Sequence, residues 1–154
     1  MTDKVEPLVQ LLWADDDSTD ALEALADYLD DANFQLERAV DYQSAINKLE
    51  ENGGIQSLLL DVILPKARGS GSLAYDLGIT LADRAAERGV KSIVFLTVVR
   101  RSEVVDKYNE LVSKYPDVEF SYFDKTRLLE KHVLENMFHC LRTTKSGVPE
   151  ARND

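Results

Sequence analysis

Cysteine is almost absent from this sequence, which contains only Cys140. An internal disulfide is therefore excluded, and no group of cysteine and histidine residues has the spacing of a zinc site. The longest apolar stretches have the length of strands, not of membrane-spanning helices, and residues 1–7 lack the basic and apolar regions of a signal peptide. We therefore expect a cytoplasmic protein that does not enter a membrane.

Basic residues are also scarce. The 154 residues include 18 Lys and Arg against 28 Asp and Glu, which gives a formal net charge of −10 at pH 7. A nucleic-acid duplex is itself densely negative, so we expect no direct binding of nucleic acid unless the few basic residues gather on one face. The length and the 44% hydrophobic content are typical of one globular domain.

Apolar runs alternate with helical periodicities along the chain. Strands are predicted at 8–14, 34–40, 55–64, 93–96 and 118–124, and helices at 18–29, 44–51, 79–88, 102–115 and 127–142. This order predicts an α/β fold with a parallel sheet covered by helices on both faces. Residues 8–142 would form the domain, 1–7 an N-terminal extension and 143–154 a disordered tail.

The predicted connection at 66–76 is unusually long for a strand-to-helix loop. Pro65, which precedes it, is expected to end strand pairing because proline has no amide hydrogen to donate. Glycine and serine at 69–72 are typical of a loop, but they lack the Gly-Lys-Ser/Thr ending of a phosphate-binding loop.

Polar residues that carry chemistry follow four of the predicted strands. They are Asp15 and Asp16 after the first strand, Asp61 after the third, Thr97 after the fourth and Lys125 after the fifth. The carboxyl ends of parallel strands meet at one edge of the sheet, which is where ligands bind in such folds. Carboxylates brought together there repel one another and favour a divalent cation with oxygen ligands, Mg²⁺ or Mn²⁺.

A phosphoryl group would account for the two residues that the metal does not need. Lys125 offers a positive charge and Thr97 a hydroxyl, and both suit anionic phosphoryl oxygens. Asp17 is interpreted differently, as part of a helix start, because a carboxylate there is stabilised by the helix dipole. Ser18 or Thr19 would cap that helix.

These residues, taken in order, resemble the receiver domain of two-component response regulators. The motifs are Asp15-Asp16-Asp17-Ser18-Thr19, Asp61-Val62-Ile63-Leu64-Pro65, Thr97 and Tyr122-Phe123-Asp124-Lys125. The resemblance extends over about residues 8–141 and implies a doubly wound, flavodoxin-like (βα)5 fold with strand order 2-1-3-4-5.

The resemblance also implies site roles. Asp61 would be the phosphoacceptor, receiving a phosphoryl group from a histidine kinase or a histidine phosphotransfer protein. Asp16 would bind Mg²⁺ directly and Asp15 through water, with Asp61 and the backbone carbonyl of Ile63 as further ligands.

The remaining implied roles concern the phosphoryl group and the switch. Thr97, the backbone of Val98 and Lys125 would hold the phosphoryl oxygens. Movement of Thr97 would let Tyr122 turn inward and change a protein-binding surface on the helix at 102–115, the strand at 118–124 and the helix at 127–142.

In this interpretation the protein is a phosphoprotein of a two-component or phosphorelay system, and its only catalysis is slow self-dephosphorylation. The stretch at 143–154 is too short for an output domain, so we expect a stand-alone regulator that acts on a downstream protein target as a monomer or weak homodimer.

Some positions depart from the family pattern. Val98 stands where the family has a very small residue, and Ile63 and Val99 stand where it often has polar residues that place the hydrolytic water. These departures predict slow hydrolysis and a long-lived phosphorylated form. The long connection at 66–76 is best interpreted as a tolerated insertion, and the alternative is a lid in which Lys66 or Arg68 contacts the phosphate or the kinase.

Two other functions fit part of the pattern. In a haloacid-dehalogenase-like phosphatase, Asp15 would be the nucleophile, Asp17 the acid/base, and Thr97 and Lys125 the next two motifs. Such enzymes need an acidic pair after the lysine, where this chain has only acids of an amphipathic helix, and Asp61 would have no role. The second alternative is a receiver-shaped module that binds its partner constitutively.

Overall fold

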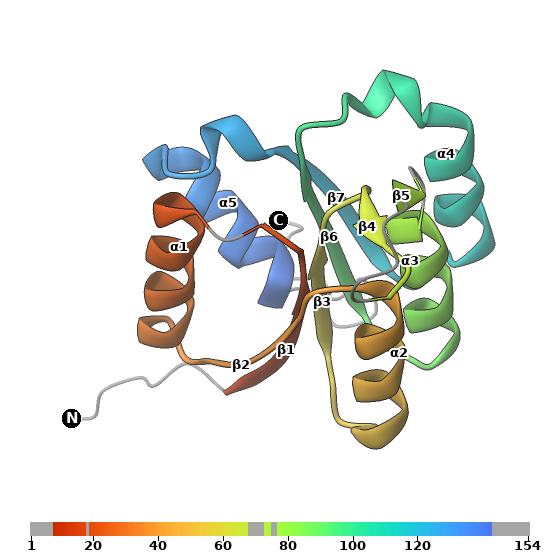
Figure 1. Ribbon diagram of the computed structural model, residues 1–154, viewed down its shortest axis with the longest axis horizontal. Coiled ribbons are helices and arrows are strands. Elements are labelled where there is room, and N and C mark those ends of the chain that lie inside the picture. Colours follow the sequence, from red (N-terminus) through yellow and green to blue (C-terminus); the bar gives the residue numbers. More distant parts are fainter. Residues whose placement is uncertain (1–7, 18, 68–72, 75–76, 143–154) are drawn as a thin grey trace, which may run out of the picture.

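Five strands form one parallel sheet in the order β2-β1-β3-β6-β7, with the helices in two layers around it (Figure 1). The computed structural model describes residues 8–17, 19–67, 73–74 and 77–142. The strands of this sheet are β1 (Val9–Ala14), β2 (Phe34–Ala39), β3 (Ser57–Leu60), β6 (Ser92–Thr97) and β7 (Glu119–Asp124). The predicted order is thereby confirmed, since β6 and β7 are the fourth and fifth strands of this sheet along the chain.

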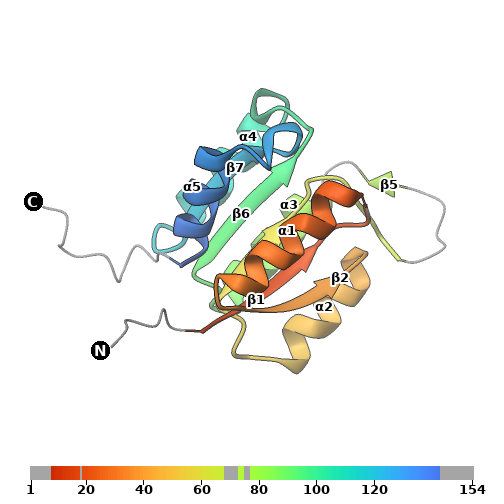
Figure 2. The same ribbon diagram turned by 90° about the vertical axis from the view of Figure 1, so that its left-hand side faces the viewer.

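Each face of the sheet is covered by its own helices. The α-helices are α1 (Asp20–Asp31), α2 (Tyr42–Glu51), α3 (Leu77–Glu87), α4 (Val105–Lys114) and α5 (Lys131–Arg142). Helices α1 and α5 lie on one face, and α2, α3 and α4 lie on the other (Figures 1 and 2). This is the doubly wound arrangement that the alternating pattern predicts.

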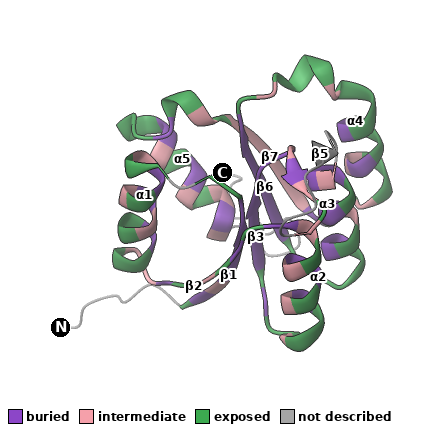
Figure 3. Cartoon of the chain, viewed as in Figure 1, coloured by how far each residue is buried: buried purple, intermediate pink, exposed green. Residues whose placement is uncertain are grey.

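The three central strands are buried on both faces almost throughout, as their largely apolar runs predict (Figure 3). Trp13 of β1 packs toward α1 and α5, while its neighbours Leu12 and Ala14 face α2 and α3. Side chains alternate across a strand, so a continuous apolar run supplies two cores at once. This burial fixes where each strand ends, and thereby the edge at which the polar residues meet.

Local capping sets the helix ends. Thr19 caps α1, as predicted, by accepting a hydrogen bond from the amide of Leu22, and Asp41 caps α2 through the amide of Ser44 at 2.7 Å. Gly89 follows α3 with a φ of 98°, a left-handed conformation that glycine adopts without a steric cost, so it ends the helix where the sequence predicts.

Two buried serines hold the last turn of α5. Ser57 of β3 and Ser92 of β6 are paired in register, and both are 1% exposed. The Ser57 hydroxyl donates to the carbonyl of Leu141 at 2.5 Å, and the Ser92 hydroxyl donates to the carbonyl of Cys140. They satisfy carbonyls that the end of a helix otherwise leaves without partners.

The expectation that Pro65 ends strand pairing is wrong. Strand β4 (Leu64–Pro65) pairs antiparallel with β5 (Leu73–Ala74), and Pro65 lies opposite Leu73. A two-stranded ribbon has only edge strands, and an edge tolerates a residue that donates no ladder hydrogen bond.

Two predicted helices also begin later than expected, each after a short 3₁₀ turn. The turn η1 (Arg101–Glu103) precedes α4, and η2 (Lys125–Arg127) precedes α5. The predicted extension at 1–7, the tail at 143–154 and Arg68 lie outside the described residues. Within the described part of the chain, no helix is long and apolar enough to cross a membrane.

Candidate functional site

The carboxyl ends of β1 and β3 place two buried aspartates side by side. Asp15 follows β1 and its amide donates to the carbonyl of Ala39 at 3.0 Å; Asp61 follows β3 and its amide donates to the carbonyl of Ala14 at 3.1 Å. Asp15 is 4% exposed and Asp61 is 5% exposed. Burial of two carboxylates is unfavourable unless cations or hydrogen bonds compensate for it.

Lys125 supplies part of that compensation, since its ammonium group lies among three carboxylates. Its Nζ is 2.8 Å from Oδ2 of Asp15, 2.9 Å from Oδ2 of Asp17 and 2.6 Å from Oδ2 of Asp61. The Lys125 side chain is only 10% exposed, so its ion pairs with the buried Asp15 and Asp61 are shielded from bulk water, whereas the Asp17 side chain is 51% exposed. Placement of Lys125 directly after β7 brings its charge to the same edge as the aspartates.

The second oxygen of Asp61 is held by hydrogen bonds. Oδ1 accepts from the hydroxyl of Thr97 at 2.5 Å and from the amide of Ile63 at 3.1 Å. Thr97 ends β6 and is 1% exposed, and its hydroxyl oxygen also accepts from the amide of Val99 at 3.2 Å. Both oxygens of Asp61 are therefore fixed, one by Lys125 and one by Thr97 and Ile63.

Burial dominates the electrostatics of Asp15. It raises the pKa of this carboxyl from 3.8 to about 6, against the opposing effects of Lys125 and of the Asp17 amide. For Lys125, burial alone would lower the pKa, but hydrogen bonds to Asp15 and Asp61 outweigh it and raise the pKa above its usual range. Lys125 therefore remains charged. The charge of Lys125 does not offset the cost of burying the ionised Asp15 carboxylate.

The donor set fits a divalent cation. Single carboxylate oxygens of Asp15, Asp17 and Asp61 lie within 4.8 Å of one another. These three carboxylates and the ammonium of Lys125 carry a formal net charge of −2, which a divalent cation would neutralise. Oxygen-only ligands favour Mg²⁺ or Mn²⁺ over softer metals.

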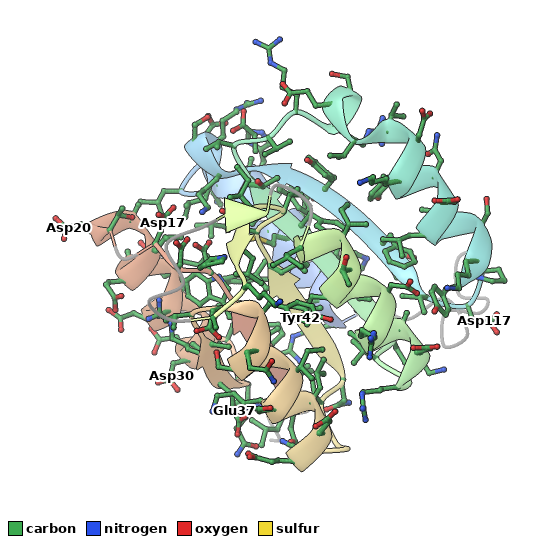
Figure 4. The ribbon with its side chains drawn as sticks, turned by 45° about the vertical axis from the view of Figure 1, so that its right-hand side comes forward. Asp17, Asp20, Asp30, Glu37, Tyr42 and Asp117 are labelled. Carbon is green, nitrogen blue, oxygen red and sulfur yellow. The ribbon has the colours of Figure 1, made fainter. Side chains whose placement is uncertain are left out.

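Asp17 is the residue that the sequence interpretation missed. The sequence alone explains Asp17 as part of a helix start, but its carboxylate joins Asp15 and Asp61 around Lys125, while the carboxylate of Asp16 lies outside that group. Burial, followed by repulsion from Asp17, raises the pKa of Asp16, so Asp16 still belongs to the same negative region. Asp17 lies just before α1, whose first residue is Asp20 (Figure 4).

Tyr122 is partly buried and packs against the core cluster that contains Phe95 and Tyr108. Its ring centroid is 5.6 Å from that of Phe95 and 5.7 Å from that of Tyr108, and its hydroxyl donates to the carbonyl of Val99 at 2.7 Å. Burial, with the charge of Asp61 next, raises the pKa of Tyr122 to about 12. The phenol therefore stays neutral and donates to the segment that follows Thr97.

Two further positions named in the sequence analysis are exposed. Val98, directly after Thr97, is 59% exposed. Lys66 is also exposed, and its backbone carbonyl accepts from the amide of Gln43, which joins the β4 side of the long connection to the start of α2.

Comparison with known proteins finds similarity in structure alone. No protein-family model matches the sequence, and no curated protein matches it. A two-component response regulator from Clostridium difficile has a TM-score of 0.64 at 20% identity, over 86% of this chain and 94% of that chain. A CheY-like receiver domain from Methylobacillus flagellatus has a TM-score of 0.60 at 18% identity, over 88% and 99%.

A third similar structure is the BeF3-activated N-terminal receiver domain of Klebsiella pneumoniae RstA. Its TM-score is 0.63 at 20% identity, over 87% of this chain and 99% of that chain. These likenesses confirm the predicted fold, which is the flavodoxin-like fold of response regulator receiver domains.

Proposed function

We propose that this protein is a response regulator receiver that accepts a phosphoryl group on Asp61 from a histidine kinase or a histidine phosphotransfer protein. The observation that carries the proposal is the state of the Asp61 carboxylate. It is buried and contacted on one oxygen by Thr97 and on the other by Lys125. Phosphoryl transfer to a carboxylate needs a hydroxyl and an ammonium at these places, because charge builds up there.

The transfer forms one bond and breaks one. A carboxylate oxygen of Asp61 bonds to phosphorus, and the bond from phosphorus to the donor's imidazole nitrogen breaks, its electron pair leaving with the imidazole. Lys125 offsets the negative charge of the incoming group, and the Thr97 hydroxyl, with the Val98 amide, donates to phosphoryl oxygens. A bound Mg²⁺ would supply the remaining positive charge.

The proposed Mg²⁺ ligands are Asp15, Asp16, Asp61 and the carbonyl of Ile63, and the geometry supports Asp17 as an additional group around the ion. Protonation of Asp15 removes one of the negative charges that attract the ion. Binding of Mg²⁺ should therefore weaken as the pH falls below about 6.

The proposed output is a change in the surface formed by α4, β7 and α5. Thr97 and Tyr122 connect this surface to the site, because the Thr97 hydroxyl contacts Asp61 and the Tyr122 hydroxyl contacts Val99 two residues later. Movement of Thr97 onto a phosphoryl group would move the segment that Tyr122 holds. Val105 of α4 and Leu129 before α5 are 40% and 46% exposed, and they offer apolar contacts to a protein target.

A small phosphodonor tests the proposal without knowledge of the kinase. Phosphoramidate, whose phosphorus is bound to nitrogen as in phosphohistidine, is incubated with the protein and Mg²⁺, and intact mass spectrometry counts the phosphoryl groups. We expect one group per chain, none after removal of Mg²⁺ and none in Asp61→Asn. Asp117→Asn is the control, because Asp117 is exposed on the far side from Asp17 (Figure 4).

The same experiment separates the alternatives. A haloacid-dehalogenase-like phosphatase would release phosphate through many turnovers and would lose activity in Asp15→Asn but not in Asp61→Asn. A constitutive binding module would take up no phosphoryl group. The spectroscopic signals of Tyr122 and α4 would also stay unchanged when beryllofluoride, a mimic of the phosphoryl group, is added with Mg²⁺.

A further inference from the structure

Gly78 is the second residue of α3, and it packs against the main chain of the proposed phosphoacceptor. It is buried, and its amide donates to the carbonyl of Val62 at 2.9 Å. The chain thus leaves the site after Asp61, passes through the β4–β5 ribbon and returns to the same backbone at the start of α3.

No side chain fits at Gly78. A Cβ there would lie 2.1 Å from the carbonyl oxygen of Asp61, 2.7 Å from the Cα of Val62 and 2.8 Å from the carbonyl oxygen of Val62. All three are backbone atoms, so no flexible side chain can move away to make room. Gly78 does not have a positive φ, in contrast to Gly89, so close packing and not backbone conformation requires glycine here.

The main chain at Asp61 is consequently held from two sides. On one side the Asp61 amide donates to the carbonyl of Ala14, and on the other the first turn of α3 rests against its carbonyl through Gly78. The same main chain carries the Ile63 amide that fixes Oδ1 of Asp61. A shift of this backbone would move the carboxylate relative to Thr97 and Lys125.

We infer that Gly78 is a positioning residue that sets the place of the Asp61 carboxylate by letting α3 seat directly on the Asp61–Val62 backbone. The inference rests on the proposed function for its effect on phosphoryl transfer. An ordinary contact of 3.4 Å in place of 2.1 Å requires a displacement of about 1.3 Å. Misplacement of reacting groups by about 1 Å can slow a reaction about a hundredfold.

The test compares Gly78→Ala with two glycine variants that leave Asp61 untouched. Gly53→Ala adds a Cβ into open space, and Gly89→Ala has no close neighbour but strains the backbone at a φ of 98°. Phosphorylation by phosphoramidate at saturating Mg²⁺ should slow by tenfold to about a hundredfold in Gly78→Ala. It should stay within about twofold of wild type in both controls, even though Gly89→Ala loses stability.

A second measurement does not depend on phosphorylation. The amide resonance of Ile63 reports the hydrogen bond to Oδ1 of Asp61. It should shift in Gly78→Ala and stay in place in Gly53→Ala and Gly89→Ala. An unchanged Ile63 resonance in a folded Gly78→Ala protein would overturn the inference, whereas failure of wild type to take up a phosphoryl group would overturn only the proposed function.

If Gly78→Ala does not fold, hydrogen exchange in the wild-type protein tests whether Gly78 positions the Asp61–Val62 backbone. The inference predicts that the amides of Gly78 and Ile63 open together, with the same exchange protection, because one packing contact holds both. If the Ile63 amide exchanges while the Gly78 amide stays protected with the rest of α3, then Gly78 stabilises only the helix and does not position Asp61, and the inference is overturned.

Discussion

Replacement of Asp15 by asparagine should stabilise the metal-free protein. Asp15 is a buried carboxylate whose pKa is raised from 3.8 to about 6, with burial as the largest cause. A raised pKa means that the folded state binds the proton more tightly than the unfolded state. The stabilisation from this group is therefore fully present below pH 3.8 and is lost as the pH rises through about 6.

The size of this free-energy change follows from the shift in the pKa of Asp15. Each pKa unit corresponds to about 1.4 kcal/mol, so a shift of about two units costs the folded state about 3 kcal/mol at neutral pH. Asparagine removes the charge but also the ion pair with Lys125, so we expect a gain of about 1–3 kcal/mol in the free energy of unfolding. In a chain of this size, each kcal/mol gained in the free energy of unfolding raises the Tm by about 2–4 °C.

Urea denaturation in EDTA and in Mg²⁺ measures the effect. Wild type should gain stability from Mg²⁺, by about 2.7 kcal/mol when the ion is at about 100 times its Kd, and Asp15→Asn should gain much less. Asp27→Asn, on the exposed side of α1, is the control and should change neither value. Destabilisation of the metal-free protein by Asp15→Asn, or equal stabilisation of both proteins by Mg²⁺, would contradict an unfavourable charge on Asp15.

Three further predictions concern other parts of the structure. Ser92→Ala leaves the carbonyl of Cys140 without its partner and should lower the free energy of unfolding by about 1–2 kcal/mol, measured in urea; a change below about 0.3 kcal/mol would contradict the assigned hydrogen bond. Tyr122→Phe removes the hydroxyl that binds the Val99 carbonyl and should cost about 0.5–1.5 kcal/mol in the same assay, with no loss expected if that contact does not form in solution. Val98→Ala removes an apolar group beside the site and should shorten the lifetime of phosphorylated Asp61, followed by mass spectrometry; an unchanged or longer lifetime would count against a role for Val98.

The positions of the buried strands could be predicted because a strand buried on both faces has a nearly continuous apolar sequence. The apolar run before Asp15 ends where β1 ends, whereas the predicted strand at 55–64 extends past β3, which ends at Leu60 directly before Asp61. Parallel topology brings both carboxylates to one edge of the sheet. The same logic places Thr97 and Lys125. The same apolar runs therefore predict both the buried strands and the edge of the sheet at which the polar residues of the site meet.

Tertiary contacts could not be predicted in the same way. An aspartate before a helix is usually explained by capping or the helix dipole, and only the position of the Lys125 ammonium shows that Asp17 belongs to the cluster. The pairing of Pro65 with Leu73 was missed because strands of two residues have no periodicity. Gly78 likewise gives no local signal, since its requirement arises from a backbone that is distant along the chain.

The proposed function requires that Asp61 is the residue that receives the phosphoryl group. The most direct measurement is to treat the phosphoramidate-labelled protein with borohydride, which reduces an aspartyl phosphate to homoserine, and to locate the product by peptide mapping. We expect homoserine at position 61 and at no other aspartate. Reduction at Asp15, or a stable phosphoryl group that borohydride does not remove, would contradict it.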